Sequence, residues 1–308
     1  MNIAILGATS QIAKDLILSL SRSSSFNLLL FVRNVNFLRE WLNSENLNKK
    51  CHIQEYSNFN DDQNYNIIIN FVGIGDPLRI EKVGSDVFKI TEKYDDMALD
   101  YIKTHKETKY IFLSSGAVYG GDHQKPASEN TTAIIDINNL SPTGFYAIAK
   151  LYAEAKHRSL SDLPIVDVRV FNYFSHTQNM NARFLITDLV CAIKNKEVFK
   201  TSSDNIVRDF ITPPDFYSLI QAIIDFKPIN TALDCYTKSP ISKFDLLSAL
   251  ESNFGLKWHI DQPVLINATG LKLNYYSTNN MAKNIGYNPK NTSKDGVIQE
   301  INFLESLF

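Results

Sequence analysis

Two stretches of the sequence carry side chains whose types and spacing suit proton transfer. In "SPTGFYAIAKLYAEA" (141–155), Tyr146 precedes Lys150 by four residues, within an apolar pattern that predicts a helix. Positions i and i+4 share a helix face, so the ammonium lies near the phenol and lowers its pKa toward working pH. In "YIFLSSGAVYGG" (110–121), Ser115 follows the apolar run 110–113, and its hydroxyl can hydrogen-bond a substrate oxygen. We therefore predict Ser115, Tyr146 and Lys150 as catalytic residues, with Tyr146 as the general acid/base.

The opening of the chain has the pattern of a dinucleotide-binding turn. "GATSQIA" (7–13) follows the apolar run 2–6 and precedes a predicted helix, 12–20. Gly7 supplies the turn, and the N–H groups at the start of the helix suit a pyrophosphate. Ser10 and Ala13 stand where the usual fingerprint has two more glycines; alanine adds one methyl, and Ser10 can cap the helix or bond a phosphate oxygen. An incidental strand, turn and helix is the alternative interpretation.

The end of the second predicted strand indicates which cofactor the turn would hold. NAD-binding chains place an acid there for the ribose hydroxyl, but no acid lies between Asp15 and Glu40. Arg33, in "LLLFVRN", can instead pair with the 2'-phosphate of NADP, although it can also be a solvated loop residue. We expect NADP, with NAD as the alternative. The candidate cofactor-binding residues are Gly7, Thr9, Ser10, Gln11, Ile12, Arg33, Phe71, Gly73, Tyr146, Lys150 and Phe171.

The elements that must position these residues alternate between strands and helices. Near-continuous apolar runs predict buried parallel strands, and helical spacing separates them. The chain therefore reads as an α/β protein: a Rossmann-type doubly wound parallel sheet with a smaller mixed α/β C-terminal substrate lobe. We assign 1–171 to the NAD(P)-binding domain and 172–308 mainly to substrate binding, with part of 200–236 returning to the first domain. The predicted strands are 3–6, 28–32, 67–72, 110–113 and 165–170; the predicted helices are 12–20, 87–105, 145–161, 180–196, 214–226 and 242–254.

Composition excludes several classes of partner. The 308 residues have a formal net charge of −2, which gives no attraction to nucleic acid or to an anionic membrane. The three cysteines are far apart and form neither a disulfide framework nor a metal-binding pattern, so we expect buried thiols and no metal. Without a leader-like segment or an apolar run of spanning length, we expect a cytoplasmic protein.

Taken together, the motifs resemble the extended short-chain dehydrogenase/reductase family, in particular its nucleotide-sugar epimerases, dehydratases and reductases. Tyrosine and lysine at this spacing also arise by chance, but here they occur in order behind a nucleotide-type turn. The resemblance implies that Lys150 holds the cofactor ribose and that Asn172 and Arg208 bind the diphosphate of a nucleotide-sugar substrate; a surface pair of Arg208 with Asp209 is the alternative. It also implies a homodimer through the helices 87–105 and 145–161. The matching stretches are "LSSGAVYG" (113–120), "YAIAK" (146–150), "RVFNYF" (169–174), "VRDFITPPDF" (207–216) and "MAKNIGYNP" (281–289).

One departure from the family narrows the reaction. Its 4,6-dehydratases carry an Asp-Glu pair directly after the hydroxyl residue, whereas this chain has Gly116 and Ala117. Neither can transfer a proton, which disfavours dehydration. We expect an NADP-dependent reductase of a nucleotide-linked 4-keto, 6-deoxy sugar. The alternatives are a nucleotide-sugar epimerase with tightly bound NAD and a non-catalytic NADP-sensing protein.

Overall fold

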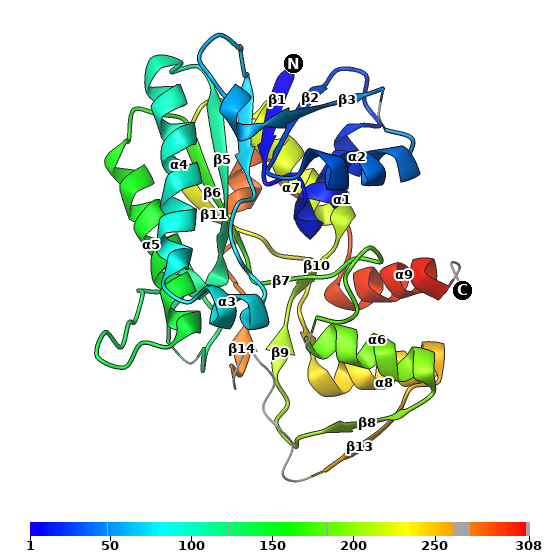
Figure 1. Cartoon of the computed structure of the whole chain (residues 1–308). Helices are drawn as coiled ribbons and strands as arrows, with labels where there is room; N and C mark the ends of the chain where they lie inside the picture. The colour runs from blue at the N-terminus through cyan, green and yellow to red at the C-terminus, as the bar shows by residue number, and fades with distance from the viewer. Residues whose placement is uncertain (48, 122, 183, 262–271, 306–308) are drawn as a thin grey trace.

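A single parallel sheet forms the centre of the first lobe (Figure 1). The computed structural model describes residues 1–47, 49–121, 123–182, 184–261 and 272–305. The seven strands lie in the order β11-β6-β5-β4-β1-β2-β3, which confirms the Rossmann-type sheet. Their bounds are β1 Asn2–Leu6, β2 Asn27–Val32, β3 Cys51–Glu55, β4 Ile67–Asn70, β5 Lys109–Ser115, β6 Ile165–Val170 and β11 Thr231–Asp234.

Helices cover both faces of the sheet because its central strands carry apolar side chains on both faces. In β1, Ile3 and Ile5 pack with the helices α1 (Gln11–Leu20), α2 (Val35–Ser44) and α7 (Pro213–Asp225). Ala4 and Leu6 pack on the other face with α4 (Asp86–Thr104) and α5 (Pro142–Ser159). Since these helices cover the two faces of the sheet, the carboxyl ends of the strands remain available for a site.

The second lobe is smaller and mixed, as expected, and lies below the sheet in Figure 1. Its core is formed by residues such as Leu189, Leu247 and Ile301, from three helices. These are α6 (Leu185–Asn195), α8 (Lys243–Phe254) and α9 (Ser293–Glu305). Short strands pair β7 (Asn172–Tyr173) with β10 (Phe210–Ile211), β8 (Val198–Thr201) with β13 (Lys257–Ile260), and β9 (Val207–Arg208) with both β12 (Ile241–Ser242) and β14 (Asn274–Tyr275).

The remaining elements are short and connect the larger ones. They are η1 (Tyr56–Asn58), α3 (Pro77–Val83), η2 (Gly116–Tyr119) and η3 (Met281–Ile285). Although α7 and β11 follow the first residues of the second lobe, α7 packs on α1 and β11 pairs with β6. Cys51 and Cys235 are buried, and Cys191 is half-buried. Within the described ranges, no helix is both long and apolar enough to cross a bilayer, and no group of metal-ligating side chains is gathered.

Candidate active site

The hydroxyls of Ser115 and Tyr146 meet at the carboxyl end of β5. Ser115 is the last residue of β5, and its Oγ accepts a hydrogen bond from Ala117 N at 3.2 Å. The helix α5 starts at Pro142, with Ser141 accepting a hydrogen bond from Gly144 N, which puts Tyr146 in its second turn. The Ser115 hydroxyl is close enough to Tyr146 to favour its ionised form. The structure thus brings the predicted pair together.

Lys150 lies behind this pair and is 2% exposed. Its Nζ donates to Leu113 O at 2.7 Å and lies 4.2 Å from the centre of the Phe112 ring. Burial lowers the pKa of Lys150 to about 8, although nearby carboxylates oppose this effect. Burial also raises the pKa of Tyr146 well above its ordinary value, and only the bond with Ser115 opposes it. The expectation that Lys150 lowers the pKa of the phenol is therefore wrong for this structure, because the ammonium binds a carbonyl and an aromatic face instead.

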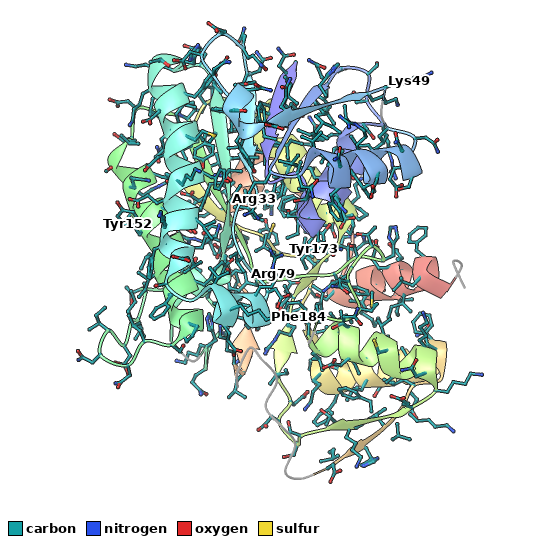
Figure 2. All side chains as sticks on the ribbon, viewed as in Figure 1. Arg33, Lys49, Arg79, Tyr152, Tyr173 and Phe184 are labelled. Atoms are coloured by element: carbon teal, nitrogen blue, oxygen red, sulfur yellow. The ribbon has the colours of Figure 1, made fainter. Side chains whose placement is uncertain are left out.

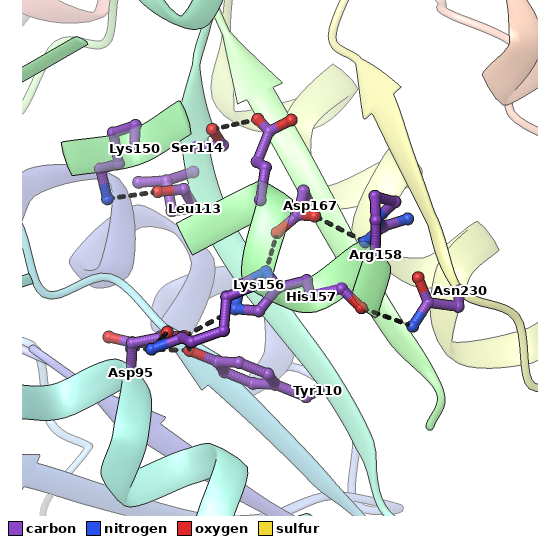
Figure 3. A network of polar contacts seen from close by, with 12 residues as sticks. Asp95, Tyr110, Leu113, Ser114, Lys150, Lys156, His157, Arg158, Asp167 and Asn230 are labelled. Atoms are coloured by element: carbon purple, nitrogen blue, oxygen red, sulfur yellow. Dashed lines mark hydrogen bonds and ion pairs between the residues drawn. The ribbon is translucent and has the colours of Figure 1, made fainter. Parts of the chain in front are cut away.

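A buried network of charges lies beneath Lys150 and joins α4, α5 and β6 (Figure 3). His157 is fully buried, with Nδ1 2.6 Å from Asp167 Oδ1 and Nε2 2.7 Å from Asp95 Oδ1. A neutral imidazole has one N–H only, so two ionised carboxylates require the protonated ring. Burial lowers the pKa of His157, but the bonds to both carboxylates outweigh burial and raise it to about 9. His157 is thus a core histidine.

The opening turn has the geometry that a pyrophosphate requires. Gly7 has φ +76°, and a Cβ added there would lie 3.0 Å from Phe71 C and 3.0 Å from Val72 N, so any other residue would be strained. Ser10 caps α1 by accepting a hydrogen bond from Ala13 N at 3.3 Å, and Ala13 is fully buried. The loss of two glycines is thus accommodated: serine caps the helix, and alanine packs in the space of the third glycine. A Cβ on Gly73 would lie 3.0 Å from Lys150 Nζ, so the backbone at this glycine closely approaches the lysine.

The other predicted cofactor residues differ in their exposure and in their contacts. Thr9 and Arg33 are exposed, and Ile12 is half-buried. Arg33 forms no ion pair among the described residues, and it lies in the region between the lobes (Figure 2). Phe71 packs in the core against Phe216, so only its backbone borders the turn. The side chain of Gln11 donates to Ser175 Oγ at 2.6 Å and to Thr177 Oγ1 at 2.9 Å, so it is bound to another part of the protein.

Phe171 explains the glycine that follows Ser115. A Cβ on Gly116 would lie 2.3 Å from Cδ1 of the Phe171 ring, so the ring fills the space of any side chain at position 116. The Phe171 ring also packs against Tyr275, at 5.3 Å between centres. The acid of the dehydratases therefore has no room beside Ser115 in this chain.

The predicted substrate residues gather around Tyr275. Asn172 Nδ2 donates to Tyr275 O at 3.0 Å. Arg208 is 6% exposed, donates to Val207 O and Lys272 O, and lies with Cζ 6.0 Å from the centre of the Tyr275 ring. Burial lowers the pKa of Arg208 to about 10. Asp209 accepts instead from Thr237 and Ser293, so the alternative of a surface pair between Arg208 and Asp209 is wrong.

Sequence analysis did not predict two residues of this region, Lys272 and Tyr275. Lys272 Nζ lies 4.4 Å from the centre of the Tyr275 ring, and burial, with Arg208 nearby, lowers its pKa to about 8. The Tyr275 hydroxyl is 3.5 Å from Ser115 Oγ. Neither Arg208 nor Lys272 pairs with a carboxylate in the described ranges. Two cations that lack an acidic partner are suited to a dianionic ligand.

Known proteins of similar sequence and structure place the chain in a family. Residues 3–231 match the model of the NAD dependent epimerase/dehydratase family. A search of curated proteins found no match. The UDP-glucuronic acid 4-epimerase of Bacillus cereus, solved with UDP-glucuronic acid and NAD, is similar over 100% of both chains, with a TM-score of 0.80 and 19% identity.

Two further solved structures agree with this fold. The UDP-glucose 4-epimerase of Thermotoga maritima, solved with UDP-glucose, is similar over 100% of both chains, with a TM-score of 0.79 and 16% identity. The dTDP-glucose 4,6-dehydratase of Bacillus anthracis, solved with NAD, has a TM-score of 0.76 and 16% identity, covering 99% of this chain and 97% of its own. With its parallel sheet, its glycine turn and the match over residues 3–231, the chain belongs to the NAD dependent epimerase/dehydratase family.

Proposed function

We propose that the protein is an NADP-dependent reductase of a nucleotide-linked 4-keto, 6-deoxy sugar. The observation that carries the proposal is that the hydroxyls of Ser115 and Tyr146 lie together, while the Phe171 ring fills the space that a side chain at position 116 would need. Ketone reduction requires one proton donor, and Tyr146 supplies it. Dehydration requires further acids directly after Ser115, and a glycine and an alanine stand there.

The residues of the first lobe fit a nicotinamide dinucleotide. Gly7 has a positive φ where the backbone turns toward the start of α1, and a pyrophosphate there would meet the backbone N–H groups of the helix N-terminus. A bound nicotinamide cofactor supplies the hydride. Lys150 would hold the ribose and Ser115 would orient the substrate carbonyl, while Arg33, exposed and without an ionic partner in the described ranges, supports a 2'-phosphate.

The second lobe supports a diphosphate-bearing substrate. Arg208 and Lys272 carry two positive charges next to Tyr275, and Asn172 is bound to the Tyr275 carbonyl. A nucleoside diphosphate supplies the anionic oxygens that both cations lack, and its sugar would then extend toward Ser115. This arrangement supports nucleotide-linked sugars over free sugars.

An epimerase is the second candidate, because Ser115, Tyr146 and Lys150 also suffice for removing a hydride from a hydroxy sugar and returning it to the opposite face. The test is to mix the protein with NADPH and a panel of nucleotide-linked 4-keto-6-deoxy sugars, and to follow cofactor oxidation and product structure. We expect one NADPH consumed for each hydroxy sugar formed. Interconversion of two hydroxy sugars without net cofactor consumption would establish the epimerase, and binding of NADP without turnover of any sugar would indicate a sensing protein.

A further inference from the structure

The first helix is bound to the substrate lobe by a set of hydroxyl and carboxyl groups that cofactor chemistry does not require. The segment 172–177, here called the junction segment, leaves β6 and passes beneath α1; Figure 2 shows Tyr173 between α1 and the second lobe. Gln11, at the start of α1, donates one N–H to Ser175 Oγ and the other to Thr177 Oγ1. These bonds begin at the helix end where a pyrophosphate would bind.

Asp15, one turn further along α1, holds the same segment. Its Oδ2 accepts from Tyr173 Oη at 2.8 Å, and its Oδ1 accepts from Thr177 Oγ1 at 2.7 Å. The Thr177 hydroxyl therefore accepts from Gln11 and donates to Asp15, which joins both residues of α1 in one network. Asp15 is 4% exposed, and its carboxylate is held by the neutral hydroxyls of Tyr173 and Thr177.

The junction segment is held at two other points, both in the substrate lobe. His176 donates through its backbone N at 2.8 Å, and its Nδ1 lies 2.7 Å from the same oxygen, Glu300 Oε2 on α9. At the beginning of the segment, Asn172 is bound to the carbonyl of Tyr275. One short segment thus contacts the helix that would hold the cofactor, the helix α9, and the strand beside the two buried cations.

We propose that Gln11 and Asp15 are positioning residues that transmit cofactor binding at α1 to the substrate lobe through the junction segment. A dinucleotide that orders the start of α1 then also orders residues 172–177, and with them α9 and the surroundings of Tyr275. The inference rests on the proposed function, because it requires a nicotinamide dinucleotide at α1. Its consequence is reciprocal: cofactor and nucleotide sugar each tighten the binding of the other.

Amide hydrogen exchange of the full chain tests this without turnover, with NADPH and NADH as separate probes. In the wild type we expect saturating cofactor to slow exchange in residues 8–14 and also, by about tenfold or more, in residues 173–178 and 296–304. Gln11→Leu removes both bonds of Gln11, and Thr177→Val removes the bond with Gln11 and the bond to Asp15. In both variants residues 8–14 should keep their protection. The slowing of amide exchange by cofactor in residues 173–178 should fall to about twofold or less.

Gln221→Leu is the matched control, because Gln221 bonds Asp225 on its own helix, α7, and α7 packs on α1. It should respond to cofactor as the wild type does. Protection of 8–14 without protection of 173–178 in the wild type would overturn the inference and leave the oxidoreductase proposal intact. An undiminished response in both Gln11→Leu and Thr177→Val, or an equal loss in Gln221→Leu, would also overturn it. If neither cofactor protects residues 8–14, the proposed function fails and the inference fails with it.

Discussion

Arg33 is the residue on which the choice of cofactor depends. It is exposed at the end of β2, no acid stands in the segment between Asp15 and Glu40, and no ion pair engages it in the described part of the chain. We expect Arg33→Ala to weaken NADPH binding by about tenfold, as for the loss of one exposed charge-assisted pair, and to leave NADH binding within about twofold. Titration of protein fluorescence with each cofactor measures this. An equal loss for both cofactors, or a wild-type preference for NADH, would contradict the assignment.

The Phe171 ring leaves room only for glycine at position 116, and the free energy of unfolding of a substituted chain measures this. A Cβ at this position would lie 2.3 Å from Phe171, so Gly116→Ala should lower the free energy of unfolding by about 1–3 kcal/mol through overpacking. Gly144→Ala is the control: a Cβ there meets nothing closer than 3.4 Å in the start of α5, so stability should stay or rise. Urea denaturation compares the two. The double variant Gly116→Ala/Phe171→Leu should recover part of the loss, and a fully stable Gly116→Ala would refute the packing argument.

Among the elements, those with a strong apolar pattern could be predicted from the sequence and the others could not. The run 165–170 is near-continuously apolar and is the observed β6, and 214–226 differs from α7 by one residue at each end. By contrast, β3 (Cys51–Glu55) lies at the edge of the sheet and is only partly buried, so its residues show neither a continuous nor an alternating pattern. The helices α2 and α9 were also missed; α2 buries only Leu38 and Leu42.

The contacts between α4, α5 and β6 make stability depend on pH. The folded pKa of His157, about 9, exceeds its ordinary value of 6.5, so its contribution is complete below pH 6.5 and decreases as pH rises toward 9. We expect His157 to lower the free energy of unfolding by about 1.5 kcal/mol between pH 6.5 and pH 8. The lowered pKa values of Lys150 and Lys272 act in the opposite direction, because their contribution to stability rises with pH, most steeply above pH 8.

Denaturation with urea across this pH range measures the effect, and one substitution isolates His157. In Asp95→Asn the amide can donate to Nε2 while Nδ1 donates to Asp167, which satisfies a neutral ring. In this variant the free energy of unfolding should decrease much less between pH 6.5 and pH 8. The decrease that remains is assigned to His176, whose pKa is raised by its bond to Glu300. A fall as steep in Asp95→Asn as in the wild type would show that His157 is not its source.

At the scale of the whole molecule, we predict a homodimer through α4 and α5. On the outer side of these helices Tyr152 is 52% exposed, beside a groove of about 90 Å³ lined also by Phe88, Ala149 and Lys156. Tyr152→Asp should therefore give a monomer in light scattering at micromolar concentration. Phe37→Asp, which alters an aromatic residue of similar exposure on α2, should remain dimeric. A monomeric wild type would contradict the prediction.

The assembly of the site also shows where sequence reasoning ends. Ser115, Tyr146 and Lys150 belong to two neighbouring elements with recognisable spacing, so these elements could be predicted from the sequence. Tyr275 and Lys272 come from a two-residue strand and its border, more than 120 residues away, and reach the site only because β14 pairs with β9. No local periodicity marks such residues. The same holds for Gln11, whose side chain binds the junction segment across the two lobes.

The central claim is that Tyr146 donates the proton to a sugar carbonyl, and turnover of the best substrate of the keto-sugar panel with NADPH tests it most directly. We predict that Tyr146→Phe lowers kcat by about a hundredfold to ten-thousandfold while the Kd for NADPH changes by no more than about twofold. Tyr152→Phe, the same change on the outer face of the same helix, should retain wild-type kcat. Wild-type turnover by Tyr146→Phe would contradict the account.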